Sequence, residues 1–470
     1  MINVGAERAR RVSTPEHPVT SPTAVSFREA LAVWFKVGLL SFGGPAGQIA
    51  LMHRILVEEK RWIGEERFLH ALNYCMLLPG PEAQQLACYV GWLLHRTWGG
   101  IVAGALFVAP GFLVVLALSF LYVTAHDTPL VAALFYGLKP AVIAIVLAAL
   151  LRIGRRALTN RVMLVLAALA FLAIAVLHLP FPLIVGGALV IGFIGGRRWP
   201  AVFALKSSHG SAAGGVVGIA GIADHAAHHR TAGWAYVLGQ IVLWGTLWLA
   251  PVAGLWWFLG GDHVLTKLAT FFSQAAVVTF GGAYAVLAYI GQAAVGTYGW
   301  LQPGEMLDGL GMAETAPGPL IKVVQFVGFL GAHRQPGDID PLLMATLGAL
   351  LVTWVTFIPS YLYIFAGAPF IERLRGNVAL SAALAAVTAA VVGVILNLAL
   401  WFALHVVFRE LHVVTWGELH VDVPVWSTID WAALVLSVAA SVAMLRFKFG
   451  MLTVLAASVV VGGAWHLISG

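Results

Sequence analysis

Four ionisable residues stand inside otherwise apolar stretches, and each lies within three residues of a proline. They are Lys139 in YGLKPAV, Lys322 in APGPLIKV, Glu82 in LPGPEAQQ and Glu314 in AETAPGP. A lysine beside a helix N-terminus makes a doubly positive place that suits an anion. A carboxyl there is favoured in its ionised form by the helix dipole and in its neutral form by burial, so it can carry a proton. The pattern indicates anion binding with proton transfer; buried counter-ions and helix caps stay open as the alternative.

The composition indicates that these residues lie in a membrane protein. Of the 470 residues, 60% are hydrophobic and 10% are charged, whereas a soluble globular protein carries about 25% charged residues. An ionisable side chain at bilayer depth costs about 2.5–3.5 kcal/mol on insertion scales, so each of the four needs a partner or a function. Two cysteines, Cys75 and Cys88, are too few for a disulfide framework and are expected to be small core residues.

Thirteen apolar stretches approach the length of about 20 residues that a membrane-spanning helix needs. They cover roughly 31–52, 70–94, 98–124, 130–151, 162–179, 181–196, 232–258, 265–292, 306–331, 341–366, 378–407, 429–446 and 449–468. The expected fold is all-α, a polytopic membrane protein with about 13 transmembrane helices. Its expected parts are a cytoplasmic N-terminal segment (1–30), a first half (31–196), a cytoplasmic linker (197–231), a linking helix (232–259) and a second half (265–470).

The distribution of positive charge predicts the orientation. With the N-terminus in the cytoplasm, 17 of the 27 Lys and Arg residues fall in inside segments, 7 in outside loops and 3 within spans. Lys and Arg concentrate in cytoplasmic loops, so this orientation is expected. The net charge of +6 is then mainly a topology signal, and a nucleic-acid partner is not expected. Residues 1–30 are polar and show no signal peptide, so the first span is expected to direct insertion.

The sequence contains an internal duplication. Residues 41–81 align without a gap on residues 279–319, with 11 identities in 41 positions. The most specific identities are Phe-Gly-Gly at 42–44 and 280–282, Trp62 with Trp300, and Pro-Gly-Pro at 79–81 and 317–319. Because seven spans separate the two starts, the copies are expected to be inverted in the membrane. Inverted repeats with interrupted helices are typical of secondary transporters, although Phe-Gly-Gly alone also fits close helix packing.

Glycine and proline interrupt helices, so both motifs are expected to break them. The residues expected to shape the breaks are Gly43, Gly44, Pro45, Gly281, Gly282, Pro79, Gly80, Pro81, Pro317, Gly318 and Pro319. In this design the half-helix ends meet near the midplane and point at the transported ion. The expected substrate ligands are Lys322, Lys139, Lys36, Gln85 and Gln325, and the expected proton carriers are Glu82 and Glu314. Snorkelling to the membrane surface is the alternative for Lys36.

Other chemistry has little support in the sequence. No HExxH, GxSxG or Walker-type motif is present, and neither a metal nor a cofactor is expected. HAAHHR at 225–230 has helical metal-ligand spacing but lies in a polar linker. For an intramembrane enzyme, the best available pair is Ser41 with His70, whose counterparts in the second copy are Thr279 and Asp308. Trp62 and Trp300 are expected to be anchors at the membrane surface.

Several of these stretches resemble the chromate ion transporter family in its long form, which has two homologous halves. They are FKVGLLSFGGPAGQIALM, RWIGEERFLHAL, LPGPEAQQLACYVG, FGGAYAVLAYI and AETAPGPLIKVVQFVGF. The likeness covers most of residues 27–120 and 265–366, although Ala283 replaces Pro45 in the second copy. It implies export of chromate, a tetrahedral sulfate-like dianion, across the bacterial inner membrane.

The resulting hypothesis is a secondary transporter that is driven by the proton motive force or by anion exchange. Its expected partners are a chromate or sulfate-like oxyanion and the lipid bilayer, and a homodimer stays an open alternative. Three other functions remain open: transport of sulfate or another oxyanion, an intramembrane enzyme, and a receptor or scaffold that moves nothing.

Overall fold

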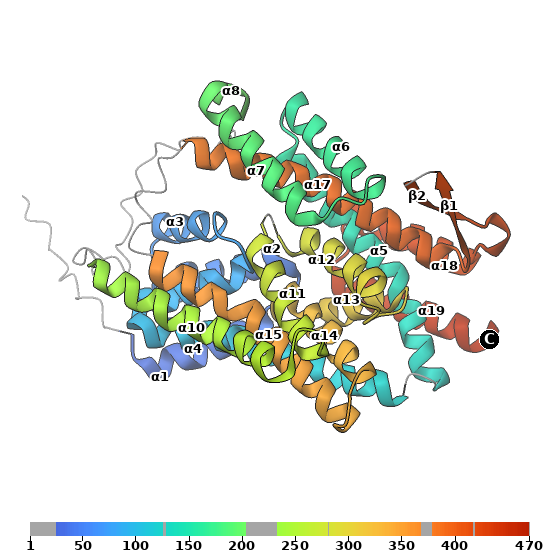
Figure 1. The fold of residues 1–470 in the computed structure, drawn as a ribbon, viewed down its shortest axis with the longest axis horizontal. Coiled ribbons are helices and arrows are strands. Elements are labelled where there is room, and N and C mark those ends of the chain that lie inside the picture. The colour runs from blue at the N-terminus through green and yellow to red at the C-terminus, as the bar shows by residue number, and fades with distance from the viewer. Residues whose placement is uncertain are drawn as a thin grey trace, which may run out of the picture.

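The computed structural model describes residues 25–125, 128–203, 233–280, 282–367, 378–416 and 419–469 (Figure 1). The first half contains α1 (Phe27–Leu40), α2 (Gly44–His53), the π-helical segment η1 (Arg54–Glu59), α3 (Glu65–Cys75), α4 (Glu82–Ala125), α5 (Pro129–Ala157), α6 (Arg161–Ala175), α7 (Phe181–Arg198) and α8 (Pro200–Phe203). After α10 (Trp234–Leu259), the second half contains α11 (Val264–Val278), α12 (Ala283–Gln292), η2 (Ala293–Thr297), α13 (Glu305–Thr315), η3 (Leu320–Lys322), α14 (Val323–Arg334), α15 (Pro341–Gly367), α17 (Val378–Val407), α18 (Trp431–Leu445) and α19 (Met451–Ser469).

The prediction of an all-α, polytopic membrane protein is confirmed. Within the described ranges, seven helices are long and apolar enough to cross a membrane: α4, α5, α7, α10, α15, α17 and α19. Nine of the expected stretches are single helices or helix arms, with ends within a few residues of those predicted. The other four, 31–52, 70–94, 265–292 and 306–331, each contain two shorter helices separated by one of the glycine motifs.

The long helices surround the short ones. In Figure 1, α7 and α17 run along the upper part and α10 and α15 along the lower part, while α2, α12 and α13 lie between them. Trp34, Met52 and Leu287 are fully buried, so the broken helices form the centre of the protein. By contrast, many large apolar residues of α10 and α18 are exposed, as is expected of surfaces that contact lipid.

The chain reverses direction inside α4. The backbone is not helical at His95 and Arg96, where Arg96 has φ 55°. Residues 82–94 and 97–125, the first and second arms of α4, then pack tightly against each other. A Cβ atom added to Gly91 would lie only 2.4 Å from the carbonyl oxygen of Gly99, so both glycines are required for this close contact.

The same arrangement recurs in the second half, at α14 and α15. A Cβ added to Gly348 would lie 2.5 Å from the carbonyl oxygen of Gly328. When Gly99 is aligned with Gly348, Pro110 falls on Pro359 and Gly111 on Ser360. The duplication therefore extends beyond the aligned 41 residues, with an insertion between α14 and α15 that changes the offset between the copies.

Two features differ from the expectations. Trp62 and Trp300 are buried, with 3% and 1% of their surface exposed, so their prediction as surface anchors was wrong. Trp300 stacks on Tyr298, just after the π-helical segment η2, with ring centroids 4.2 Å apart. In addition, β1 (Leu411–Trp416) and β2 (Leu419–Pro424) form an antiparallel hairpin between α17 and α18, which the all-α prediction did not include.

Candidate anion site at the helix breaks

The four helix breaks meet in pairs at the centre of the protein. The backbone N–H of Gly318 donates to the carbonyl oxygen of Ser41 at 2.8 Å, and the N–H of Gly80 donates to the carbonyl oxygen of Thr279 at 2.8 Å. In the duplication, Ser41 corresponds to Thr279 and Gly80 to Gly318. Each half therefore completes the break of the other half through an equivalent hydrogen bond.

Glycine is required at the breaks by backbone conformation. Gly43, Gly80, Gly282 and Gly318 have φ values of 90°, 115°, 103° and 90°, which residues with a side chain rarely adopt. These values agree with the expectation that the two motifs interrupt helices. Gly281 lies outside the described residues.

We expect Gly318→Ala to destabilise the protein by about 1–2 kcal/mol, because alanine is strained at this φ value. An added Cβ would also lie 3.2 Å from the carbonyl oxygen of Phe107. Thermal unfolding of the purified protein measures the loss. Gly239→Ala in α10, where an added Cβ meets nothing within 4 Å, is the matched control and should be neutral or slightly stabilising. Equal effects of the two substitutions would contradict the explanation.

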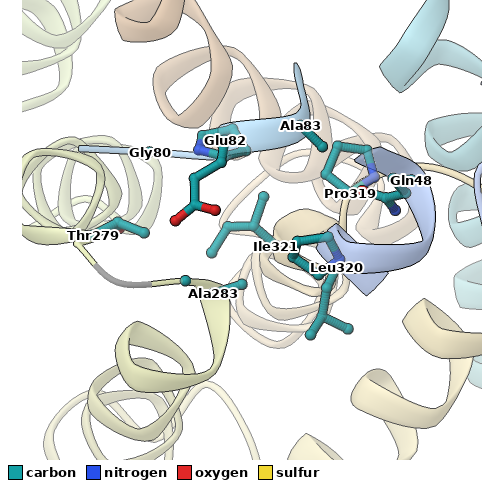
Figure 2. A pocket seen from close by; sticks show the side chains of 12 residues that line it. Gln48, Gly80, Glu82, Ala83, Thr279, Ala283, Pro319, Leu320 and Ile321 are labelled. Carbon is teal, nitrogen blue, oxygen red and sulfur yellow. The ribbon is translucent and has the colours of Figure 1, made fainter. Parts of the chain in front are cut away.

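A small cavity lies where the breaks meet (Figure 2). It is lined by Pro45, Gln48, Gly80, Pro81, Glu82, Ala83, Thr279, Gly282, Ala283, Pro319, Leu320 and Ile321. These residues include the first turns of α2, α4, α12 and the η3–α14 helix. A helix N-terminus carries a partial positive charge and N–H groups without partners in the helix. Four such ends around one cavity make a place suited to an anion.

Glu82 is the ionisable side chain that lines this cavity. Figure 2 shows its carboxylate extending from the start of α4 into the space between Gly80 and Ala283. The cavity measures about 20 Å³, which is room for about one water molecule. A tetrahedral oxyanion, with four oxygen atoms, is larger than this space. The cavity in this structure is therefore too small to hold such an anion.

Gln48 is a lining residue that was not predicted from the sequence. This side chain is 1% exposed, lines the cavity and donates through Nε2 to the carbonyl oxygen of Gly318 at 2.8 Å. It thus ties the first turns of α2 to the opposite Pro-Gly-Pro break. A glutamine within an apolar span was an available signal, but the corresponding residue, Val286, is apolar and the duplication gave no hint.

Lys322 does not line the cavity but supports its wall. Its side chain is 2% exposed, and Nζ donates to the carbonyl oxygens of Ala316 and Gly318, each at 3.0 Å. Glu314 is also buried, accepts a hydrogen bond of 2.6 Å from Tyr284 and interacts electrostatically with Lys322. These contacts hold the end of α13 against the break.

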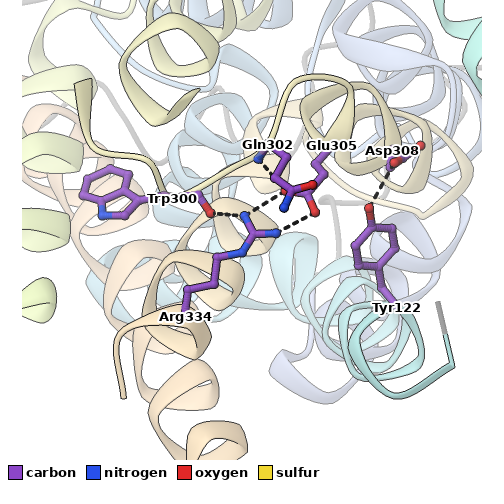
Figure 3. A network of polar contacts seen from close by, with 6 residues as sticks. All are labelled: Tyr122, Trp300, Gln302, Glu305, Asp308 and Arg334. Carbon is purple, nitrogen blue, oxygen red and sulfur yellow. Dashed lines mark hydrogen bonds and ion pairs between the residues drawn. The ribbon is translucent and has the colours of Figure 1, made fainter. Parts of the chain in front are cut away.

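Lys139 belongs to a second polar group, shown in part in Figure 3. Its Nζ lies 3.4 Å from Oδ1 of Asp308, and Asp308 accepts a hydrogen bond of 3.1 Å from Tyr122. Next to it, Arg334 binds both carboxylate oxygens of Glu305 at 2.7 and 2.8 Å and donates to the carbonyl oxygen of Trp300. The group joins α5, α13, α14 and the second arm of α4.

The three remaining side chains that were predicted as substrate ligands lie outside the cavity lining. Lys36 is on an exposed face of α1 and is absent from the cavity lining. Gln85 and Gln325 are buried and donate to the carbonyl oxygens of Pro79 and Phe112, respectively. The motif at 225–230 lies outside the described residues. Of the predicted ionisable residues, the cavity therefore brings in Glu82 alone.

The pair proposed for an enzyme is not assembled. The hydroxyl of Ser41 donates to the carbonyl oxygen of Val37, as that of Thr279 does to Ala275. His70 has its ring near Glu66, at 3.7 Å. The hydroxyl and the carbonyl oxygen of Ser41 thus both make hydrogen bonds within the helix break. These contacts do not favour Ser41 as a nucleophile with His70 as its base.

The paired broken helices and the small cavity that four helix N-termini line belong to a polytopic membrane protein. The chain belongs to the chromate transporter family, since the family model described as "Chromate transporter" matches residues 28–193 and 266–463. A "Chromate transport protein" of Pseudomonas aeruginosa is 33% identical over 391 residues, which cover 82% of this chain and 83% of that protein.

Two more distant relatives match over similar lengths. A "Chromate transport protein" of Cupriavidus metallidurans is 27% identical over 75% of this chain and 77% of its own length. A "Probable chromate transport protein" of Synechococcus elongatus is 27% identical over 76% and 80%, respectively. No solved structure matches the chain.

Proposed function

We propose that this protein exports chromate across the bacterial inner membrane as a secondary transporter, with its N-terminus in the cytoplasm. The single observation that carries the proposal is the convergence of four helix N-termini on one small cavity. Membership of the chromate transporter family and the names of the relatives support the choice of anion.

The anion would be held mainly by backbone groups. Helix N-termini offer N–H donors and partial positive charge without a full ionic charge. Such a site binds a tetrahedral dianion but recognises its shape and charge more than its central atom. Sulfate is therefore the expected competitor, and transport of sulfate or another oxyanion is the nearest rival function.

Glu82 would couple protons to the anion. An ionised Glu82 occupies the positive end of α4 and repels a second negative charge from the cavity. A protonated Glu82 removes this repulsion and can donate a hydrogen bond to an oxyanion. The dianion and one proton would therefore move together with a net charge of −1. Glu314, which lies beside Lys322, is the second proposed proton carrier.

The net charge of −1 on the transported anion and proton favours their movement out of the cell. A cell interior is negative, and each elementary charge moved through 100 mV is worth about 2.3 kcal/mol. A complex with net charge −1 would leave the cell down this potential, and exchange with an external anion would serve the same purpose. The potential component of the proton motive force is thus the proposed source of energy.

Access would alternate through the two halves. Around the cavity, the hydrogen bonds of Gly80 with Thr279 and of Gly318 with Ser41 hold the breaks together. We propose that one pair separates to admit the anion while the other stays closed. Inverted repeats would allow the two halves to exchange these roles.

The test is chromate uptake into everted membrane vesicles, in which export from the cell becomes uptake. Membrane potential and pH gradient are imposed separately, with and without excess sulfate, and vesicles without the protein are the control. We expect uptake that requires the protein, rises with an inside-positive potential and falls with sulfate. The absence of protein-dependent uptake under all of these conditions would overturn the chromate assignment. Sulfate uptake without chromate uptake would favour the rival anion.

A further inference from the structure

The helices on both sides of each break are too short to cross a membrane alone. In the first half, α1 has 14 residues and α3 has 11; in the second half, α11 has 15 and α13 has 11. A membrane-spanning helix needs about 20 residues. Two short helices joined by a break can therefore cross the membrane as one interrupted span, or turn back at the break and leave by the face at which they entered. The contacts at their outer ends distinguish these two arrangements.

In the first half, both helix pairs return to the face at which α1 begins, called the α1 face from here on. Lys60 follows η1, and its Nζ lies 2.8 Å from Oε1 of Glu29 in the first turn of α1. Five residues separate η1 from α3, so α3 begins at the same face. His95 follows the first arm of α4, and its Nε2 lies 2.8 Å from the carbonyl oxygen of Val25, just before α1. The first arm therefore returns to the α1 face as well.

In the second half, the corresponding ends meet at the face at which α13 begins, called the α13 face. Arg334 ends α14 and donates to the carbonyl oxygen of Trp300 at 2.6 Å and to Oε1 of Glu305 at 2.7 Å. Asp308, in the first turn of α13, accepts a hydrogen bond of 3.1 Å from Tyr122, near the far end of the second arm of α4. That arm starts at the α1 face and is long and apolar enough to cross a membrane, so the two faces are opposite. Figure 1 shows α13 to the right of α1 and α3.

The helices α11 and α12 also fold back on each other. Phe271 in α11 contacts Tyr298, beyond η2, with ring centroids 5.4 Å apart. In one interrupted span, these two rings would lie on opposite sides of the break. Within the described ranges, the four pairs are therefore hairpins, two at each face, and the second helix of each hairpin begins at the centre. This arrangement explains why four helix N-termini line the same cavity.

The distribution of positive charge assigns the α1 face to the cytoplasm. If the four pairs crossed the membrane, residues 53–69 would lie outside. As hairpins, they place Arg54, Lys60, Arg61 and Arg67 on the side of the N-terminus; adding these four to the 17 gives 21 inside and leaves 3 outside. Two crossings are removed from each half, so every other segment keeps its expected side. Because Lys and Arg concentrate in cytoplasmic loops, this distribution favours hairpins over interrupted spans.

We propose that the four broken pairs are re-entrant hairpins, two from the cytoplasm and two from outside, and that each set is the gate on its own face. The gating role rests on the proposed transport function, whereas the hairpin arrangement does not. On the cytoplasmic face, Nε2 of His53 in α2 lies 2.5 Å from Oε2 of Glu65 in α3 and joins the two hairpins. On the outer face, Arg334 joins its two hairpins through Trp300 and Glu305. Separation of one set would open the cavity to one side only.

The first experiment locates the loop between the first two hairpins. Single cysteines in the full chain are labelled with a membrane-impermeant maleimide in spheroplasts and in everted vesicles. Glu66→Cys is the reporter, because Glu66 is 90% exposed. Asp262→Cys and Lys448→Cys are exposed controls that lie outside and inside, respectively, in both arrangements. The native Cys75 and Cys88 are buried and stay in place.

We expect Glu66→Cys to behave like Lys448→Cys, with labelling in everted vesicles and loss of labelling in spheroplasts. Labelling of Glu66→Cys in spheroplasts at the rate of Asp262→Cys would make the first pair an interrupted span and would overturn the proposal. This measurement needs no oxyanion, so its failure is distinct from a failure of the transport proposal.

The second experiment tests the gates, again without an oxyanion. Ala83→Cys places a thiol in the cavity lining, where Ala83 is 1% exposed, and a small charged thiosulfonate is the probe. Adding Glu65→Gln removes the carboxylate that joins the cytoplasmic hairpins, so labelling should become faster in everted vesicles and stay unchanged in spheroplasts. Adding Glu305→Gln should have the opposite pattern. Glu66→Gln, which removes the neighbouring exposed carboxylate, is the matched control and should change neither rate.

The native protein without Ala83→Cys gives the background, and thermal unfolding checks that each variant is folded. Faster labelling from both sides in either folded variant would show general loosening and would overturn the assignment of one gate to each face. Unchanged labelling in both variants would show that these contacts do not hold the gates and would overturn the gating role, while the first experiment still decides the hairpins.

Discussion

Replacing Lys322 with methionine is expected to lower the free energy of unfolding by about 3–5 kcal/mol and to abolish chromate transport. The substitution removes the charge beside the buried Glu314 and leaves Arg152 as the other positive group that acts on it. It also removes the donor that Ala316 and Gly318 share. The milder Lys322→Gln retains a donor, and it should abolish transport while the protein still inserts into the membrane.

A double-mutant cycle separates the charge effect from packing. Glu314→Gln combined with Lys322→Met removes both charges, so we expect it to recover much of the stability lost in the single variant. Lys267→Met is the matched control, because Lys267 pairs with Asp262 at an exposed position and its loss should cost less than about 1 kcal/mol. Unfolding in detergent measures stability, and vesicle uptake measures transport. A single variant as stable as the native protein would show that Lys322 and Glu314 are not coupled.

The second large effect is expected at Glu82. Glu82→Gln keeps the shape of the side chain but cannot gain or lose a proton, so the cavity no longer couples proton and anion. We expect net chromate uptake driven by an imposed pH gradient to fall by about tenfold or more, which corresponds to about 1.4 kcal/mol. Exchange of labelled for unlabelled chromate should continue, because it needs anion binding and access without release of a proton.

Two vesicle assays on the same preparation measure these activities: net uptake under an imposed gradient, and exchange at equilibrium. Glu66→Gln on α3 is the control, since Glu66 is 90% exposed and outside the cavity lining. It should leave both activities unchanged. Loss of exchange together with net uptake in Glu82→Gln would assign Glu82 to anion binding or folding instead of proton coupling.

The sequence predicted the breaks better than it predicted the contacts across them. Glycine and proline restrict the backbone locally, so Phe-Gly-Gly and Pro-Gly-Pro show in the sequence where helices stop. The direction of a side chain depends on packing between distant segments. The sequence therefore identified Lys322 as important, but not that its ammonium group faces the carbonyl oxygens of Ala316 and Gly318.

The ion pair of Lys139 with Asp308 was not predicted from the sequence for a related reason. Asp308 stands in an apolar stretch, but its duplicate is His70, so the two copies do not share an acid at this position. The ion pair forms because α5 packs on α13, and these helices are far apart in sequence. The β1–β2 hairpin was not predicted from the sequence, because it is short and lies between two strongly apolar helices.

The crossed hydrogen bonds at the breaks also affect how the protein is made. The carbonyl oxygen of Ser41 accepts its hydrogen bond from Gly318, and the side chain of Gln48 donates to an acceptor 270 residues further along the chain. During synthesis, the first half therefore enters the membrane with its central polar groups unmatched. The site closes only after most of the second half has been inserted, and a shortened chain would present those open groups to the proteases that remove incomplete membrane proteins.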